Sequence, residues 1–290
     1  MPELPEVETI VRDLRPQLEA RVVERAYAAE PGVLRYPGAG AFAARLPGQR
    51  MVRVGRHGKF IMIDLEGEAG EQLLVIHLGM TGRLGIAEPE SDLAPHTHLR
   101  LLLSSGAELR MQDPRRFGRV LLGTLAELRL AGKLPLLGPE PGSQQGRLPP
   151  GGARLGGALT LRDLGRVLGR SHRAVKAVLL DQAAVAGLGN IYADEACFRA
   201  GVRPQAISAR LGPERRRRLY VAIHDALDSA VNLRGSSIDD YRDGFGEKGQ
   251  NQHVLLVYGR AGQPCSRCDR TLLKTVVAGR TTVYCPRCQR

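Results

Sequence analysis

The chain begins Met1-Pro2-Glu3-Leu4-Pro5-Glu6-Val7-Glu8, and the other motifs of the sequence are best understood from this stretch. Removal of Met1, which is usual before a small second residue, leaves the secondary amine of Pro2 as the chain terminus. An α-amino group titrates at about 8 and a lysine at about 10.4, so at neutral pH the terminal amine is far more often uncharged and nucleophilic. Glu3 follows directly and is close enough to transfer the protons that such an attack requires.

The same stretch also fits the beginning of an ordinary helix. Pro5 suits the first helical turn, where Glu6 and Glu8 favour the helix dipole. Apolar residues then recur at spacings of three and four, as on one face of a helix: Val7, Ile10, Val11, Leu14 and Leu18. On these residues alone the purely structural interpretation is favoured, and it is the rest of the chain that reverses this preference.

Composition limits the class of protein. A chain of 290 residues is long for one domain, and 43% hydrophobic residues are enough for a packed core. The net charge of +12 indicates a polyanionic partner, nucleic acid before a membrane surface, and nearly all of it comes from 37 arginines against five lysines. No apolar run has the length of a membrane span and no signal peptide is recognisable, so we expect a cytoplasmic protein without a membrane partner.

The hydrophobic pattern changes twice along the chain. Residues 22–123 contain short strands broken by glycine and proline, which predicts a β-sandwich in an N-terminal domain at 1–136. A linker is expected at 137–158, because residues 142–157 are of low complexity. Helical periodicity then predicts a domain at 159–260, whose last helix, near 213–233, should end at Gly235. Residues 235–252 are polar and rich in glycine, which suits a mobile loop.

Four cysteines near the C-terminus have the spacing of a structural zinc site. They read Cys265-x2-Cys268-x16-Cys285-x2-Cys288, so two pairs of thiolates can form a closed tetrahedron. We therefore expect one zinc ion that organises a domain at 261–290 and takes no part in catalysis. Basic residues surround these cysteines, which indicates contact with phosphates. Cys197 lies apart, in an apolar stretch, and is expected to be a small buried side chain.

Three further motifs leave alternatives open. Gly187-Leu188-Gly189-Asn190 precedes a helix, so Asn190 either caps that helix or forms a phosphate clamp together with Lys176. Asp113-Pro114-Arg115-Arg116-Phe117-Gly118 lies in a turn between two predicted strands. Phe117 there either belongs to the core or is an exposed wedge that enters a base stack. His77-Leu78-Gly79-Met80-Thr81-Gly82 ends another strand in a turn that would expose Met80.

Together these motifs resemble bacterial formamidopyrimidine-DNA glycosylase, a bifunctional enzyme family that removes 8-oxoguanine from DNA. The similarity runs nearly from end to end and rests on these segments: Pro2–Glu8, His57–Phe60, His77–Gly82, Asp113–Gly118, Gly187–Tyr192, Val257–Arg260 and the finger with 279–288. The linker at 142–157 is longer than is usual in the family. The resemblance implies an α+β protein: an N-terminal β-sandwich with an N-terminal helix, then a helix–two-turn–helix domain with a zinc-finger β-hairpin.

The resemblance also implies a mechanism. Pro2 would be the nucleophile at C1′ of the damaged nucleotide, and Glu3 the acid and base for sugar opening. Glu6 would support the site from the same helix, and Lys59 belongs to the same catalytic set. The resulting iminium would permit β- and δ-elimination, which cuts the strand on both sides of the lost base.

Partners and DNA contacts follow from the same resemblance. The partner would be double-stranded DNA that contains oxidised purines, bound by a monomeric protein. Met80, Arg115 and Phe117 would fill the gap left by the extruded base, with Arg115 facing the orphaned cytosine. Residues matching the phosphate contacts of the family are Lys59, His77, Lys176, Asn190, Tyr258 and Arg280. The loop at 235–252 would cover the lesion.

Two other functions remain to be compared with this one. Endonuclease VIII belongs to the same superfamily and acts on oxidised pyrimidines, but its members typically have glycine where Leu4 stands and lack the Met80 and Phe117 pattern. A non-catalytic zinc-ribbon nucleic-acid binder would explain the charge and the finger. It would leave Pro2 and Glu3 without a role.

Overall fold

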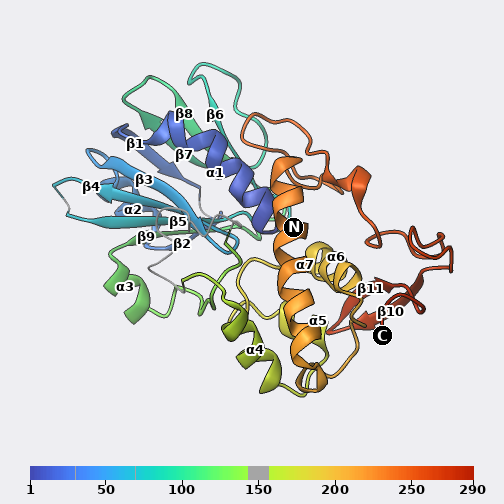
Figure 1. Cartoon of the computed structure of the whole chain (residues 1–290). Helices are drawn as coiled ribbons and strands as arrows, with labels where there is room; N and C mark the ends of the chain where they lie inside the picture. The colour runs from blue at the N-terminus through green and yellow to red at the C-terminus, as the bar shows by residue number, and fades with distance from the viewer. Residues whose placement is uncertain (30, 69, 143–156) are drawn as a thin grey trace. The chain divides into compact units, whose positions relative to one another are not determined.

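The computed structural model describes residues 1–29, 31–68, 70–142 and 157–290 (Figure 1), so most of the predicted linker lies outside the described residues. The described chain packs as two units. The N-terminal unit consists of Met1–Pro135 together with Arg234–Gln250, and the C-terminal unit contains the remaining described residues. The segment Arg234–Gln250 therefore packs with the N-terminal unit, although in the sequence it lies within the predicted helical domain.

Two β-sheets form the N-terminal unit. The first is antiparallel, in the order β1 (Val23–Ala28), β7 (Thr97–Leu103), β8 (Glu108–Gln112), β6 (Arg83–Ala87). The second has the order β2 (Leu34–Tyr36), β9 (Arg119–Gly123), β5 (Gln72–His77), β4 (Phe60–Glu66), β3 (Arg50–His57), and only its β2–β9 pair is parallel. Alternating apolar residues of both sheets meet in one buried cluster, as a β-sandwich requires.

Helix α1 (Leu4–Leu18) packs against strands of both sheets, β3 and β4 of one and β6 of the other. Its predicted apolar stripe is confirmed, because Ile10, Val11, Leu14 and Leu18 are all 0% exposed. Pro5 lies in the first turn, where the missing N–H costs nothing. Two short helices complete the unit, α2 (Ala39–Arg45) and α3 (Leu125–Leu130). The core of the sandwich therefore fixes where the N-terminus of the chain lies.

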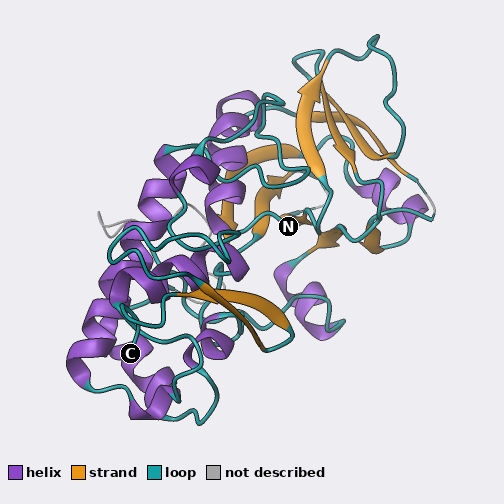
Figure 2. Ribbon diagram, turned by 90° about the vertical axis from the view of Figure 1, so that its right-hand side faces the viewer, coloured by secondary structure: helices purple, strands orange, loops and turns teal. Residues whose placement is uncertain are grey.

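The C-terminal unit is helical and ends in a β-hairpin (Figure 2). Its elements are α4 (Leu161–Gly169), α5 (Val175–Leu179), α6 (Asn190–Ala200), η2 (Ser208–Arg210), α7 (Pro213–Asn232), η3 (Asn251–Val254), β10 (Leu273–Val277) and β11 (Arg280–Tyr284). The apolar side of α7 packs against α6. The prediction that Gly235 ends α7 is wrong by one position. The helix ends at Asn232, and Arg234 already has the left-handed conformation, with φ of 59°.

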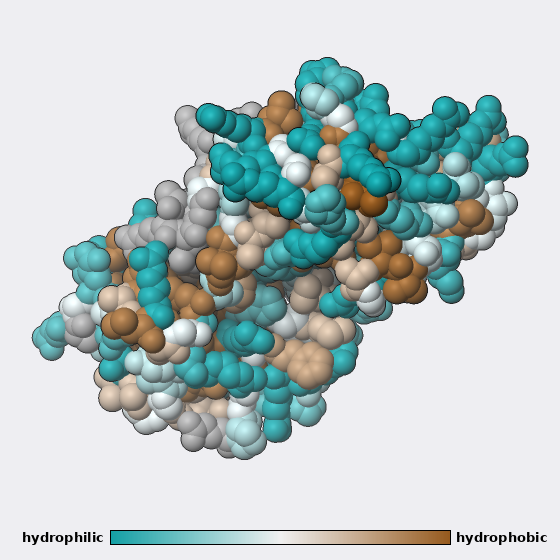
Figure 3. Space-filling model, turned by 90° about the horizontal axis from the view of Figure 1, so that it is seen from below, coloured by the Kyte–Doolittle hydropathy of each residue, from teal (hydrophilic) through white to brown (hydrophobic). Residues whose placement is uncertain are grey.

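The surface is mostly hydrophilic on the face that Figure 3 draws. Apolar side chains form small separate patches there. None of the described helices is both long enough and apolar enough to cross a membrane. Two of the exposed apolar side chains, Met80 and Phe117, belong to motifs that the sequence had singled out.

Candidate active site and nucleic-acid interface

The residues at the N-terminus of α1 are buried, and the carboxylate of Glu6 binds backbone groups from two parts of the chain. Pro2 is buried, Glu3 is 3% exposed and Glu6 is 1% exposed. One carboxylate oxygen of Glu6, Oε2, accepts the backbone N–H of Glu3 at 2.8 Å, and the other, Oε1, accepts the backbone N–H of Ser236 at 2.7 Å. The Tyr241 hydroxyl oxygen lies 3.4 Å from the Glu6 carbonyl oxygen. Glu6 thus joins the predicted catalytic residues Pro2 and Glu3 to the segment at 234–250.

A second buried carboxylate fastens α1 to the sheet. Glu8 accepts one hydrogen bond from Nε of Arg56 in β3 and one from Nε of Arg12, both at 2.7 Å. Burial raises the pKa of Glu8, but the two guanidinium groups outweigh burial and hold it below its ordinary value. In the sequence Glu8 is recognisable only as an acidic residue of the first helical turn, and nothing there indicates Arg56 as its partner. Their pairing spans 48 positions, which no local pattern reveals.

The two predicted wedge motifs lie side by side in the N-terminal unit. Asp113 is fully buried; its Oδ1 accepts the Thr81 hydroxyl at 2.5 Å, and its Oδ2 accepts the Gly118 N–H at 2.7 Å. Gly79 has φ of 63°, and a Cβ there would lie 2.6 Å from backbone atoms of Phe117 and Gly118. Only glycine therefore permits this approach of the two turns. Both motifs are visible in the sequence, but nothing there indicates Thr81 and Asp113 as the residues that join them.

The joined turns present three exposed side chains. Met80 is 40% exposed and Phe117 is 51% exposed, so Phe117 is not a core residue. Arg115 is exposed as well, and its guanidinium carbon lies 4.6 Å from the centroid of the Phe117 ring. That distance is within the range of a cation–π contact, which orients the two side chains together. Such an arrangement suits insertion beside a disrupted base pair.

Lys59 and His77 lie close together at the end of the second sheet. Lys59 is 5% exposed, in the turn between β3 and β4, and His77 is the last residue of β5. Burial, together with the positive charges of Lys59 and Arg119, lowers the pKa of His77 to about 4. Its Nδ1 accepts the N–H of Gly79 at 3.1 Å, which places the proton of the neutral ring on Nε2. His77 is then a neutral hydrogen-bond donor, which suits a phosphate oxygen.

The first prediction concerns this histidine. Nuclear magnetic resonance titration of the His77 ring should give a midpoint near 4, about where burial and the adjacent charges place it. Between pH 6.5 and pH 4 the folded chain binds fewer protons at His77 than the unfolded chain does, so this group lowers stability as the pH falls through that window. His77→Gln should weaken the dependence of stability on pH there. A midpoint of 6 or above would contradict the neutral assignment.

In the C-terminal unit, Asn190 and Lys176 meet at one carbonyl oxygen. The Asn190 side chain donates to Thr281 O at 3.1 Å, and Lys176 Nζ donates to the same oxygen at 3.0 Å. The N-cap of α6 is Gly189, so the alternative that Asn190 caps this helix is wrong. Thr281 follows Arg280, which is exposed at the beginning of β11. Both side chains therefore fix the hairpin strand that carries Arg280.

Lys176 does not lie where a direct phosphate contact would require it. It is 0% exposed, and besides Thr281 O its Nζ contacts Asp194 Oδ1 at 2.7 Å and the Thr282 hydroxyl at 2.8 Å. Burial of a charge is tolerated only when it is paired and hydrogen-bonded, as here. The expectation that Lys176 touches phosphate is therefore corrected: the ammonium group is already enclosed by protein oxygens.

Two acidic residues that sequence reasoning missed complete this arrangement. Asp194 also accepts the N–H of Val283 at 3.1 Å, so it binds both Lys176 and the hairpin. Its neighbour Glu195 accepts the backbone N–H groups of Leu256, Val257 and Tyr258 at 2.8–3.0 Å. These bonds fix the backbone at Tyr258, which is partly exposed. The sequence does contain a signal for these roles, namely two adjacent acidic residues inside an apolar helix. Carboxylates that are buried in such a helix need hydrogen-bond donors from elsewhere in the protein.

The second prediction tests the buried ion pair of Lys176 and Asp194. Lys176→Met should lower the free energy of unfolding by about 3–5 kcal/mol, because it leaves Asp194 buried without its partner. Lys176→Met combined with Asp194→Asn should recover part of that loss. Urea denaturation followed by circular dichroism measures both. Lys133→Met, at an exposed lysine, serves as the control. If Lys176→Met lowered the free energy of unfolding no more than this control does, the ion pair would contribute little to stability.

The four cysteines come together as the spacing predicts. Their sulfur atoms all lie within 4.8 Å of one another, with Cys268 and Cys285 at 3.5 Å and Cys265 and Cys288 at 3.9 Å. A tetrahedral zinc ion with bonds of about 2.3 Å requires sulfur separations of about 3.8 Å. The donor set therefore fits a metal ion, and zinc in particular. Cys197 is fully buried and lies outside the cluster, as expected.

Comparisons with known proteins agree along the whole chain. Residues 1–120 match the formamidopyrimidine-DNA glycosylase N-terminal domain, 155–242 the helix–two-turn–helix domain of the same enzymes, and 262–290 a zinc finger found in them and in isoleucyl-tRNA synthetase. The formamidopyrimidine-DNA glycosylase of Moorella thermoacetica is 44% identical over 94% of this chain and 93% of its own. That of Chloroflexus aurantiacus is 41% identical over 100% of this chain and 98% of its own.

Solved structures give the same result. The MutM (Fpg) protein of Thermus thermophilus has a TM-score of 0.82 at 41% identity, covering 99% of this chain and 98% of its own. The Lactococcus lactis Fpg in complex with DNA containing an abasic site has a TM-score of 0.85 at 30% identity, covering 99% of each chain. This chain thus matches its relatives in both sequence and structure over nearly their full lengths. This chain belongs to the formamidopyrimidine-DNA glycosylase family, a family of DNA glycosylases with AP lyase activity.

Proposed function

We propose that this chain excises oxidised purines, including 8-oxoguanine and formamidopyrimidines, from duplex DNA with Pro2 as nucleophile and Glu3 as acid and base. The observation that carries the proposal is that Pro2 and Glu3 are both buried at the start of α1, where the Glu6 carboxylate accepts the backbone N–H of Glu3. The relatives in the family, among them an Fpg in complex with abasic-site DNA, support the choice of substrate. Since the relatives are bacterial, we expect the enzyme to act in the cytoplasm, where bacterial DNA lies.

The proposed chemistry begins once Met1 has been removed. The secondary amine of Pro2 attacks C1′ of the damaged nucleotide, the bond to the base breaks, and the base leaves with a proton. Glu3 protonates the sugar ring oxygen as the ring opens, which gives a cationic iminium between Pro2 and C1′. The iminium acidifies the C2′ proton, so β-elimination releases the 3′ phosphate, and δ-elimination then releases the 5′ phosphate. Glu6 positions Glu3 through its backbone and does not touch the substrate.

Contacts with DNA are proposed for residues of each unit. The base must leave the stack to be reached, at a cost of a few kcal/mol. Met80, Arg115 and Phe117 would fill the space it leaves, with Arg115 facing the cytosine. Phosphate contacts are proposed for these residues: Lys59, His77, Asn190, Tyr258 and Arg280. Lys176 is given a positioning role, because its Nζ holds the strand that carries Arg280.

One structural zinc ion is proposed at the four cysteines. Bound there, it would tie the two ends of the β10–β11 hairpin together, since Cys265 and Cys268 precede β10 and Cys285 and Cys288 follow β11. Four thiolate ligands leave no open position for substrate. The finger would therefore contribute to DNA binding through Arg280 and not to the chemical steps.

The third prediction tests the nucleophile. Borohydride reduction with a duplex carrying 8-oxoguanine opposite cytosine should trap the protein on DNA, and peptide mass mapping should locate the adduct at Pro2. Glu3→Gln should slow excision by about 10²-fold to 10⁴-fold, the usual contribution of a general acid or base. A variant with one uncleaved residue before Pro2 should fold normally and give no adduct. An adduct at Lys59 would assign the nucleophile elsewhere. Binding without any cleavage would instead indicate a non-catalytic binder.

The fourth prediction tests the metal. Elemental analysis should find one zinc per chain, and Cys268→Ser should lower the zinc content towards zero. Affinity for duplex DNA should then fall about tenfold or more, because the metal no longer holds together the two ends of the hairpin that carries Arg280. Cys197→Ala is the matched control, since Cys197 is the one cysteine of the chain outside the cluster. Full zinc content in Cys268→Ser would contradict the four-thiolate site.

A further inference from the structure

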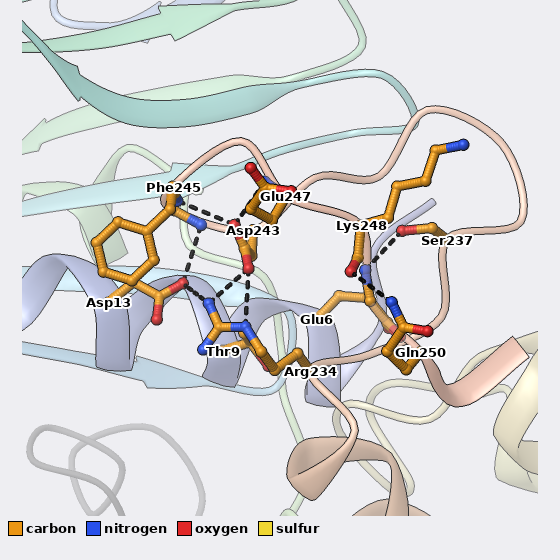
Figure 4. A network of polar contacts seen from close by, with 12 residues as sticks. Glu6, Thr9, Asp13, Arg234, Ser237, Asp243, Phe245, Glu247, Lys248 and Gln250 are labelled. Atoms are coloured by element: carbon orange, nitrogen blue, oxygen red, sulfur yellow. Dashed lines mark hydrogen bonds and ion pairs between the residues drawn. The ribbon is translucent and has the colours of Figure 1, made fainter.

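Arg234 occupies an unusual position between α7 and the segment that packs on α1. It has φ of 59°, in the left-handed region that costs an L-residue roughly 1 kcal/mol or more and favours glycine. Gly235 follows with φ of 81°. An interaction of the side chain can offset this cost. The guanidinium group supplies one, because it binds two carboxylates at once (Figure 4).

The two carboxylates come from parts of the chain that are far apart in sequence. Arg234 Nη2 donates to Asp13 Oδ2 at 2.6 Å and to Asp243 Oδ2 at 2.5 Å, and its Nε donates to Asp243 Oδ2 at 2.8 Å. The side chains of Asp13 and Asp243 are 5% and 1% exposed, whereas that of Arg234 is 42% exposed. Since both carboxylates bind the same guanidinium nitrogen, they are close neighbours. Without Arg234, two buried negative charges would repel each other.

Each carboxylate also holds the backbone of the segment. Asp13 Oδ2 accepts the N–H of Gly244 at 3.0 Å, and a Cβ at Gly244 would lie 2.7 Å from Asp13 Cβ. Asp243 Oδ1 accepts the N–H groups of Phe245 at 3.0 Å and Glu247 at 2.9 Å. The turn at 243–247 is therefore shaped by Asp243 and seated on α1 by Asp13. The sequence-based expectation of a mobile loop did not include these contacts.

A second attachment lies two helical turns away, at the start of α1. Glu6 accepts the N–H of Ser236, and the Tyr241 hydroxyl donates to Arg234 O at 3.1 Å. Glu6 and Asp13 are seven residues apart, which is about 10 Å along the helix. The segment from Arg234 to Glu247 is thus fixed to α1 both beside Pro2 and Glu3 and at Asp13. Its position relative to the proposed catalytic pair depends on both attachments.

We propose that Asp13, Arg234 and Asp243 form a clamp that positions the segment Arg234–Glu247 over the damaged base during excision. All three are positioning residues, because they act through the segment and do not touch the reacting atoms. The proposal rests on the proposed function. An abasic site has no base for the segment to hold, so the clamp should matter for excision of 8-oxoguanine and not for cutting at an abasic site that is already present.

The fifth prediction uses Arg234→Gly and Asp13→Asn. Glycine relieves the left-handed backbone at 234, so any loss in Arg234→Gly comes from removal of the guanidinium and not from backbone strain. With a clamp, single-turnover excision of 8-oxoguanine should fall about tenfold, equivalent to about 1.4 kcal/mol. Cutting of a duplex with a preformed abasic site should stay within about twofold. The double variant should be no slower than Arg234→Gly alone, because both changes break one interaction.

Hydrogen exchange of the protein without DNA provides a readout independent of activity. The amides of Gly244 and Phe245 should exchange about tenfold faster in both single variants, again about 1.4 kcal/mol. Arg50→Gln is the matched control. It removes one arginine from an exposed ion pair of the same unit, in which Arg50 and Glu66 are 52% and 56% exposed, and should leave both rates unchanged.

Three outcomes would overturn the clamp: equal loss of excision and abasic cutting, unchanged excision in Arg234→Gly, or unchanged exchange at Gly244. The first would indicate a general loss of DNA binding or folding. Failure of the proposed function itself has a different signature. The unsubstituted protein would then cut neither duplex, while the exchange rates of Arg234→Gly and Asp13→Asn would still decide whether the clamp holds the segment.

Discussion

The carboxylate of Glu6 is the interaction on which the proposed active site depends. It lies at the N-terminus of α1, where unpaired backbone N–H groups and the helix dipole favour a negative charge. One oxygen binds the N–H of Glu3 and the other binds the N–H of Ser236, 230 residues further along the chain. With 1% exposure, Glu6 cannot replace either bond with water without disturbing the helix start. The chain terminus and the segment from Arg234 onwards are therefore positioned by one group.

Buried charges elsewhere support exposed contact residues in the same way. Asp113 joins the turns that expose Met80 and Phe117, and Glu195 fixes the backbone at Tyr258. Lys176 holds the strand that begins with Arg280. An exposed side chain has few contacts of its own, so its orientation must come from the buried groups that hold its backbone. A substitution at a buried charge should consequently alter DNA recognition without removing any residue that touches DNA.

Much of the fold could be predicted because its signals are local. The short strands predicted within residues 22–123 are present, β4 among them, and the apolar stripe of the first helix is buried as the spacing indicates. The zinc site was equally accessible, since two Cys-x2-Cys pairs place their ligands within a few residues of each other. The end of α7 was missed by one position because glycine is the usual residue in the left-handed conformation, and here Arg234 adopts it.

By itself, the sequence determined the helix start that carries Pro2 and Glu3, the sandwich strands and the metal-binding cysteines, because each depends on neighbours along the chain. Tertiary structure decided which polar side chains are buried and with whom they pair. Lys176 has the appearance of a phosphate ligand in the sequence, yet its ammonium group meets Asp194 and a hairpin about 105 residues away. Arg234 reaches Asp13 across 221 positions. Pairings at such separations arise only when the folded core brings the elements together, so no residue spacing encodes them.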